Sequence, residues 1–469
     1  MATKMQPTGS SPKQHVGVMV FPFGSHVISL FHLVRKLATA IPNTHVSFFN
    51  TAKSNNSIFL ASKSTHEDIP SNIKAYNIGD GVPMNHVFTS YPGEAVELFL
   101  KATPDNFYQG FDTAVSEIGL KISCLITDGL LSFAGDISKE MHVPWIPVWS
   151  PVPHSLYVHV YTDLIRQHYA NVEGSDSGDK TLEFIPGLSK IHMDDLPDGI
   201  LPKSSSNLEE SLFHSMLSKL GHMLPQSATV VMNYYQELYP VPLLDDLKFK
   251  FPGLLNVGYV TLSMPPPPLL PSNLDATGCL SWLDGQKDMS VAYISFGTVA
   301  VVPPNETLEL GEALEASGVP FLWTLKDDLK DHLPNGFLER TSMQGKVVPW
   351  APQTQVLAHS SIGVCVTHFG ANSVNESIAN GVPMIGRPFF ADHHINGRIV
   401  EEIQGIGLRV EALTKSGVIE SLELVLVHEQ GKEMRKKVQS LKEIVLKAAG
   451  PTGSATKDFQ TLVEKISIL

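Results

Sequence analysis

The chain has 469 residues and a formal net charge of −13, with 43% hydrophobic and 17% charged residues. That length predicts two or three domains with cores of their own. The acidic balance argues against duplex nucleic acid or an anionic membrane surface as a partner. The apolar share is too high, and the charged share too low, for a disordered chain.

The cysteine pattern indicates a reducing compartment, and the start of the chain gives no sign of secretion. Cys124, Cys279 and Cys365 are far apart and form neither a disulfide framework nor a Cys-x-x-Cys metal pattern. The polar start, residues 1–14, lacks the apolar stretch of a secretory signal, and no later run approaches the ~18 apolar residues that cross a bilayer. We therefore expect a cytoplasmic protein without membrane insertion.

The first half alternates buried strands with helices. An apolar run from Val16 closes at Gly24 and His26, and apolar residues at helical spacing follow from Leu30 to Leu37. Similar apolar runs recur at 46–49, 122–127, 145–148 and 230–232. Such a series predicts a parallel sheet with crossover helices.

A second α/β pattern follows a proline-rich segment. Its strands are expected at 291–296, 321–323, 346–348, 363–367 and 383–386. Prolines favour extended geometry, so we interpret 263–274 as a linker between a first domain, 1–262, and a second, 275–449. A Gly450-Pro-Thr-Gly break predicts two terminal helices, the last within 450–469. Two open parallel sheets favour a ligand site in the cleft between them.

The stretch from Trp350 to His393 carries the densest motif. Residues 367–373 follow a buried strand and open a helix, where backbone amides and the helix dipole favour an anion such as phosphate. An alternative is purely local, with Ser373 and Glu376 forming a capping box and Gly370 easing a turn. Spacing alone leaves both interpretations open.

Several motifs together resemble one family. Within 350–393 they are Trp-Ala-Pro-Gln at 350–353, the set His368 to Glu376, Asn-Gly-Val-Pro at 380–383, and Asp392. Elsewhere they are the segments 21–26, 80–83, 294–298, 387–390 and 450–454. The chain thereby resembles the plant secondary-product UDP-glycosyltransferases (glycosyltransferase family 1), in particular the flavonoid 3-O-glycosyltransferase branch.

The resemblance implies an α/β fold of two facing Rossmann-like domains, the GT-B fold, with a cleft between them. The N-terminal domain would bind the acceptor, the C-terminal domain would bind UDP-sugar, and the last helix would cross back. Trp350 would stack on uracil, Gln353 would meet the nucleoside and Glu376 the ribose, which suits an indole face, an amide and a carboxylate. The remaining UDP-binding residues would be Thr298, Ala351, His368, Gly370, Ala371, Asn372 and Ser373.

The sequence departs from the family pattern at two positions. Phe369-Gly370-Ala371 stands where most members have Cys-Gly-Trp, so the phosphate loop lacks its usual tryptophan. His393 stands where glucosyltransferases usually have glutamine, and within the family histidine is associated with galactose. The implied sugar-binding residues are Ser150, Asp392 and His393, and the implied acceptor-binding residues are Gly24, His159 and Phe389.

His26 and Asp128 resemble the catalytic pair of the family. Each follows a predicted strand, so both would lie at the same edge of the sheet. The histidine would be the general base, and the aspartate would fix its tautomer and stabilise the imidazolium. Taken alone, His26 is one of 19 histidines, and Asp128 before Gly129 fits a turn residue.

No metal or other cofactor is expected. Adjacent residues rarely face one ion, which argues against Asp392-His393-His394 as ligands, and the chain has no Asp-x-Asp triplet. The expected function is inverting transfer of galactose from UDP to the 3-hydroxyl of a flavonol or anthocyanidin by a monomer. The alternatives are UDP-glucose as donor, or a non-catalytic nucleotide-sugar binder. A dinucleotide oxidoreductase is disfavoured, because the turn at Gly24 lacks Gly-x-Gly-x-x-Gly.

Overall fold

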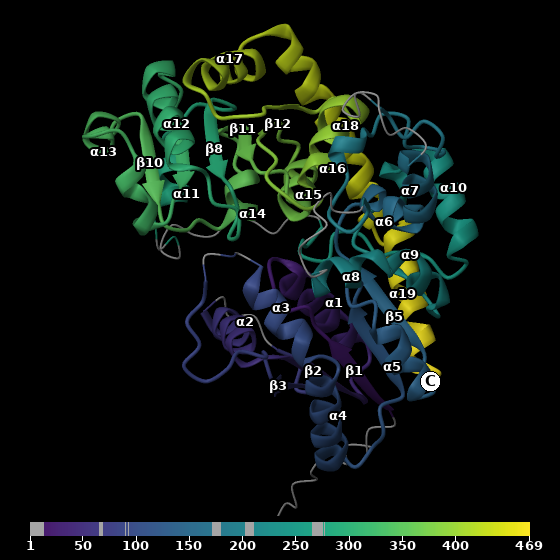
Figure 1. The fold of residues 1–469 in the computed structure, drawn as a ribbon. Helices are drawn as coiled ribbons and strands as arrows, with labels where there is room; N and C mark the ends of the chain where they lie inside the picture. The colour runs from purple at the N-terminus through teal and green to yellow at the C-terminus, as the bar shows by residue number, and fades with distance from the viewer. Residues whose placement is uncertain are drawn as a thin grey trace, which may run out of the picture.

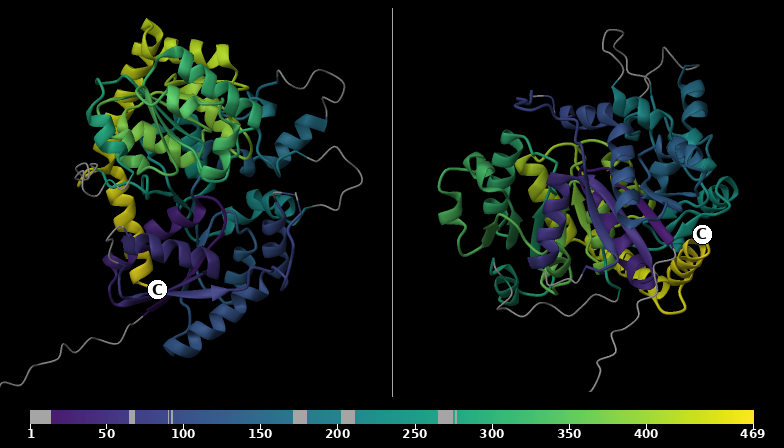
Figure 2. Two further views of the ribbon diagram at one scale, coloured as in Figure 1. Left: turned by 90° about the vertical axis from the view of Figure 1, so that its left-hand side faces the viewer. Right: turned by 90° about the horizontal axis from the view of Figure 1, so that it is seen from below.

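The computed structural model describes residues 14–64, 69–89, 91, 93–170, 180–201, 211–264, 275 and 277–469. Its described strands form two sheets, one in each half of the chain, and all the registered strand pairs are parallel. The second half lies above the first in Figure 1, and the left-hand view of Figure 2 keeps the two lobes distinct.

The first sheet has seven strands in the order β3-β2-β1-β4-β5-β6-β7. They are β1 (Gln14–Met19), β2 (Thr44–Thr51), β3 (Ile73–Ile78), β4 (Cys124–Asp128), β5 (Trp145–Trp149), β6 (Val231–Met232) and β7 (Leu255–Asn256). Val16 and Val18 of β1 pack with α1 (His26–Ala40), while Met19 belongs to the cluster on the opposite face, with α3 (Glu94–Ala102) and α4 (Asp105–Ile118). Burial on both faces explains the unbroken apolar run.

The strand order of this sheet reverses between β1 and β4. β1 pairs with β2 on one side and with β4 on the other. In open parallel sheets such a switch point leaves a crevice at the carboxyl ends of the strands. His26 begins the helix after β1, and Asp128 is the last residue of β4. Both therefore lie at this crevice.

The second sheet has six strands in the order β10-β9-β8-β11-β12-β13. They are β8 (Val291–Ser295), β9 (Phe321–Thr324), β10 (Gly345–Val348), β11 (Ile362–Thr367), β12 (Met384–Gly386) and β13 (Gly407–Arg409). α12 (Pro304–Ser317) and α17 (Lys415–Leu426) share a core with one face, and α14 (Gln353–Leu357), α15 (Ala371–Asn380) and α18 (Glu429–Ala449) contribute to the other core cluster. The order reverses between β8 and β11.

Further described helices surround the sheets. In the first half they are α2 (Ala52–Ser64), α5 (Ala134–Glu140), α6 (Pro153–Val160), α7 (Thr162–Ala170), α8 (Leu212–Ser218), α9 (Leu220–Met223), α10 (Val241–Lys250) and the short turns η1 (Met193–Asp195), η2 (Leu224–Gln226) and η3 (Gln236–Leu238). In the second half they are α11 (Cys279–Asp284), α13 (Phe337–Arg340), α16 (His393–Arg398), η5 (Asp327–His332) and the π-helical turn η6 (Ile399–Ile403).

The two terminal helices expected around the Gly450 break are present as α18 and α19 (Ser454–Ser467). In Figure 1 they run from the upper lobe down along the lower one. α19 joins the core of the first half through Leu462 and Ile466. Its Asp458 Oδ2 accepts a hydrogen bond from the backbone N–H of Asn256 at 2.7 Å. The end of the chain is thus packed against the first sheet.

The strands predicted from apolar runs are all present, whereas β3, β7 and β13 were not predicted. β3 is an edge strand with alternating exposure, and β7 and β13 have only two and three residues. Most of the predicted linker, 265–274, lies outside the described residues, so the domain boundaries stay a prediction. None of the helices in the described ranges is long and apolar enough to cross a bilayer. The three cysteines are buried and unbonded.

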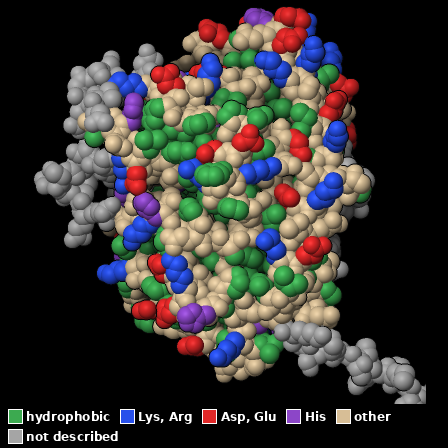
Figure 3. Space-filling view, turned by 90° about the vertical axis from the view of Figure 1, so that its right-hand side faces the viewer, with side chains coloured by type: hydrophobic (Ala, Val, Ile, Leu, Met, Phe, Trp, Pro, Cys, Tyr) green, Lys and Arg blue, Asp and Glu red, His purple; other side chains and the backbone are tan. Residues whose placement is uncertain are grey.

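One face of the molecule is seen in Figure 3. Acidic and basic side chains are interspersed on it, and no basic patch covers it.

Candidate active site

His26 and Asp128 form a hydrogen-bonded pair at the crevice of the first sheet. His26 Nδ1 lies 2.9 Å from Asp128 Oδ2. Asp128 is 1% exposed, and its other oxygen accepts the backbone N–H of Leu130 at 2.9 Å. The carboxylate is therefore fixed, and it favours the tautomer with Nδ1 protonated. That leaves Nε2 as the ring atom able to accept a proton.

The setting of His26 favours its protonated form more than water does. Burial lowers the pKa of His26, but the charge and hydrogen bond of Asp128 and the charge of Asp392 outweigh burial, so the pKa is raised above 6.5. The side chain remains 21% exposed. Since Asp392 belongs to the second half, both halves of the chain act on this imidazole.

His368 lies at the corresponding edge of the second sheet, between two glycines. A Cβ at Gly297, which has φ +71°, would come within 2.8 Å of the His368 ring, and one at Gly370 would come within 2.4 Å. The turns after the paired strands β8 and β11 therefore meet around this imidazole, and Thr298 lies on the first of them. Burial lowers the pKa of His368 to about 4, so the ring is neutral.

The helix α15 begins at Ala371, shortly after His368 in the chain. Its N-cap is Gly370, with no side-chain cap, and Ser373 and Glu376 lie inside the helix. The capping-box interpretation is therefore wrong, because the helix begins two residues before Ser373. The first-turn amides, starting at Ala371, remain open to an anion.

Two helix starts face each other across the two halves. The Ser29 hydroxyl, one turn after His26 on α1, lies 3.5 Å from the side-chain amide of Asn372 on α15. The sequence interpretation missed Ser29, although its i+3 spacing from His26 puts both on one helix face. This contact brings the base-bearing helix to the predicted phosphate site.

Gln353 connects the predicted nucleoside residues. Its amide nitrogen donates to Ser373 Oγ at 3.2 Å and to Glu376, and its oxygen accepts from the Tyr293 hydroxyl at 3.1 Å. Burial raises the pKa of Glu376 to about 7, although the Gln353 hydrogen bond opposes this. Trp350 is 63% exposed, whereas Ala351 beside it is buried. An exposed indole next to polar groups is suited to stacking on a base.

Asp392 and His393 lie at the start of α16. Asp392 is the N-cap residue, and its Oδ2 accepts from the Asn396 amide at 3.1 Å. The buried His393 ring meets His368 edge to face, with centroids 4.8 Å apart. Its Nδ1 accepts the Phe390 N–H at 3.5 Å, and burial lowers its pKa to about 3. A neutral ring bonded at Nδ1 presents Nε2–H as a donor.

The other predicted residues are divided between the two halves. Ser150 follows β5, and neither its hydroxyl nor Nδ1 of His159 on α6 has a partner among the described residues. Gly24, at φ +60°, makes the left-handed turn that leads into α1. Phe389 packs on Phe296, with centroids 6.1 Å apart, and under Arg387. Those contacts of Phe389 lie within the second half, so its predicted acceptor role stays a prediction.

The described part of the chain contains no cluster of three or more His, Cys, Asp or Glu side chains that could hold a metal ion. The adjacent Asp392 and His393 have the separate partners given above.

The chain is similar to known proteins over nearly its full length. Residues 242–444 match the family profile described as UDP-glucoronosyl and UDP-glucosyl transferase. An anthocyanidin 3-O-glucosyltransferase of Vitis vinifera is 46% identical over 467 residues, which is 99% of each chain. An anthocyanidin 3-O-galactosyltransferase of Rhododendron delavayi is 47% identical over 464 residues, 97% of this chain and 98% of that one.

Solved structures share the architecture. The crystal structure of a UDP-glucose: anthocyanidin 3-O-glucosyltransferase in complex with UDP is 44% identical, with a TM-score of 0.90 over 98% of this chain and all of that one. A glycosyltransferase structure from Phytolacca americana, at 21% identity and a TM-score of 0.80, covers 97% of this chain and all of that one and shares the fold. The expected arrangement of two parallel-sheet domains, the GT-B fold, is confirmed.

Proposed function

Because this chain belongs to the plant UDP-glycosyltransferase family, in its flavonoid 3-O-glycosyltransferase branch, we propose that it transfers a hexose from UDP to the 3-hydroxyl of a flavonol or anthocyanidin. One observation carries the proposal. The helix α1, whose His26 is bonded to Asp128, contacts the first turn of α15 in the second half through Ser29 and Asn372. This contact brings the proposed base close to the proposed anion site.

In the proposed reaction, His26 Nε2 accepts the proton of the flavonoid hydroxyl as its oxygen attacks the anomeric carbon. The bond between that carbon and the UDP oxygen breaks on the opposite face, so the configuration inverts. Asp128 stabilises the imidazolium that forms. General-base assistance contributes about 10²–10⁴-fold, and positioning of the two substrates supplies much of the rest.

The leaving UDP gains negative charge, and the second half offers donors to it. These are the open amides of α15, the neutral His368, Thr298, Asn372 and Ser373. Preorganised donors at a helix start stabilise a developing anion. We therefore propose transfer without a metal ion or other cofactor. All of these groups come from one chain, which supports a monomer as the active form.

The donor sugar is proposed to be galactose on the basis of His393. Glucose and galactose differ only in the direction of the C4 hydroxyl, so selection depends on hydrogen-bond geometry near that carbon. His393 offers a rigid Nε2–H donor, whereas glutamine offers both donor and acceptor. Glucose is the second candidate, because relatives at 46% and 47% identity are named for different sugars.

The test is product analysis with purified protein. A flavonol is incubated with UDP-galactose or UDP-glucose, and the matching flavone, which lacks the 3-hydroxyl, is the control. We expect a β-linked 3-O-hexoside by mass spectrometry and NMR, and no product from the flavone. Glycosylation of the flavone at a comparable rate would contradict the 3-hydroxyl assignment, and absence of any hexoside would overturn the proposed function.

A further inference from the structure

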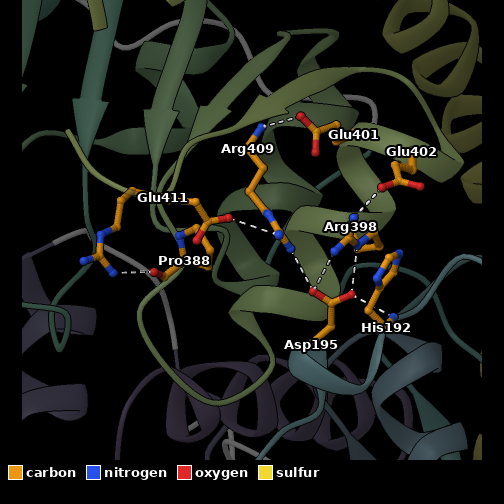
Figure 4. A network of polar contacts seen from close by, with 9 residues as sticks. His192, Asp195, Pro388, Arg398, Glu401, Glu402, Arg409 and Glu411 are labelled. Atoms are coloured by element: carbon orange, nitrogen blue, oxygen red, sulfur yellow. Dashed lines mark hydrogen bonds and ion pairs between the residues drawn. The ribbon is translucent and has the colours of Figure 1, made fainter. Parts of the chain in front are cut away.

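Asp195 lies at the centre of a buried charge cluster that joins the two halves of the chain. It is 1% exposed. Its Oδ2 accepts from Arg398 Nε at 2.8 Å, and its Oδ1 accepts from Arg409 Nη1 at 2.7 Å. Figure 4 shows the carboxylate of Asp195 reaching from its own segment to both guanidinium groups. This cluster contains none of the residues to which the sequence motifs assigned a role.

The segment that carries Asp195 is folded on itself and is joined to α7 of the first half, where Arg166 Nε donates to the Ile200 carbonyl at 2.6 Å. Residues 182 and 191 are joined by a backbone hydrogen bond of 2.8 Å, and Thr181 and His192 form an antiparallel bridge. Asp195 Oδ2 also accepts the His192 N–H at 2.9 Å, which closes a capping box on η1. The carboxylate is therefore held before it meets the arginines.

Arg398 and Arg409 belong to the part of the second half that carries the residues proposed to bind the sugar and the phosphates. Arg398 is the last residue of α16, and Asp392 is its N-cap. Between them, Asn396 donates to the Phe369 carbonyl at 2.8 Å and to Asp392 Oδ2. Phe369, at φ +60°, directly precedes the N-cap of α15. A shift of α16 would thus move both Asp392 at its own start and the turn at Phe369 that leads into α15.

Loss of the contact between Asp195 and the two arginines would leave Asp195 without a cation but would leave each arginine with another partner. Arg398 keeps Glu402 as a partner, and Arg409 keeps Glu411 at 3.0 Å, both on the second half. The two arginines that pair with Asp195 both come from the second half. A buried carboxylate without a cation is strongly disfavoured, so Asp195 resists separation of the halves. The π-helical turn η6, a feature often found at functional sites, directly follows Arg398.

We propose that Asp195 is a positioning residue, which binds Arg398 and Arg409 and thereby holds α16 in register with the first half. Through α16 it aligns Asp392 and the start of α15 with His26. The alignment matters because the attacking oxygen is oriented by one half and the anomeric carbon by the other. This inference rests on the proposed transfer reaction for its kinetic consequence, though not for the contact itself.

The experiment compares Asp195→Asn with Asp194→Asn, because Asp194 is the exposed neighbour and undergoes the same change of charge. We expect Asp195→Asn to lower kcat by about 10–100-fold, since a misplacement of about 1 Å has effects of this size. UDP affinity, measured by calorimetry, should stay within about twofold, because Trp350, Gln353 and Glu376 all lie in the second half. Asp194→Asn should match the wild type in both.

Hydrogen exchange gives a readout that does not depend on the reaction. In Asp195→Asn, the amides of α16 should exchange about tenfold faster, while those of α12, which packs in a different core cluster from α16, stay unchanged. In the double variant Asp195→Asn with Arg409→Gln, the loss of kcat, expressed as a free energy, should be smaller than the sum of the losses in the two single variants. Such non-additivity is expected when both substitutions remove the same contact.

Three results would overturn the inference. These are a kcat of Asp195→Asn within twofold of Asp194→Asn, a loss of UDP affinity equal to the loss of kcat, and unchanged exchange in α16. If the wild type transferred no sugar at all, the proposed function would fail, and the exchange comparison would still decide whether Asp195 holds α16.

Discussion

His26 and His368 both lie where a sheet reverses its strand order, His26 after β1 of the first sheet and His368 after β11 of the second, yet their surroundings are opposite. The pKa of His26 is raised, because Asp128 and Asp392 outweigh burial, whereas burial alone lowers the pKa of His368 to about 4. The setting of His26 favours uptake of a proton, whereas His368 stays neutral beside the proposed anion site.

The difference teaches that a partner, rather than the residue type, sets the role of a buried histidine. His26 Nδ1 is bonded to a carboxylate at 2.9 Å. His368 has instead a weak contact of 3.4 Å with the Thr367 hydroxyl and the edge of a second neutral ring, His393. A base needs an ionic partner that stabilises its charged form, and a phosphate site needs donors that do not titrate.

Removal of the base should have the largest effect. His26→Ala is expected to lower kcat by at least ~10²-fold, because His26 is the proposed acceptor of the proton from the flavonoid hydroxyl, while UDP affinity stays near that of the wild type. Steady-state kinetics and calorimetry check the two values. His222→Ala, at a histidine whose side chain is 69% exposed, serves as the control. Near-normal turnover of His26→Ala would remove His26 from the mechanism.

Removal of the charge of Asp128 should bring the pKa of His26 closer to that of His368. Asp128→Asn is expected to lower kcat/KM by about tenfold or more and to change its pH dependence. Only neutral His26 accepts a proton, so activity falls as the pH drops through its pKa. The wild-type pKa is raised, and removal of the aspartate charge lowers it. The acid limb of the pH–rate profile should therefore move to lower pH, and a shift to higher pH would contradict the pairing.

Substitution of His393, the neutral histidine beside His368, should alter selectivity for the donor sugar more than the rate of transfer. His393→Gln is expected to move the ratio of kcat/KM for UDP-galactose over UDP-glucose toward glucose, by about tenfold. The measurement is kinetics with each donor at saturating flavonol. If the unmutated enzyme preferred UDP-glucose, or if the ratio did not move, His393 would not be the selecting residue.

Chelation should have the smallest effect. Because the α15 amides and neutral His368 are proposed to meet the diphosphate unaided, activity after exhaustive EDTA treatment should stay within about twofold of the untreated enzyme. Loss of transfer on chelation, restored by magnesium or manganese, would show that the phosphate site needs an ion.

The sequence by itself was enough to predict most of the buried strands, the terminal helices and the edge positions of His26 and Asp128. These features depend on local information, since apolar periodicity reports burial and a polar residue after a parallel strand lies at the carboxyl edge. The family resemblance added residues 350–393 as the predicted nucleotide site. β3, β7 and β13 escaped prediction because they are short or lie at an edge, where the apolar pattern is weak.

Only the tertiary structure decided which distant residues meet. Ser29 and Asn372 are 343 positions apart, and Asp195 is 203 positions from Arg398. It also decided that Ser373 lies inside α15 and that His393 packs against His368. The reason is physical: a side chain's charge state and contacts depend on the burial and partners that other segments supply, and no local pattern encodes which segments those are.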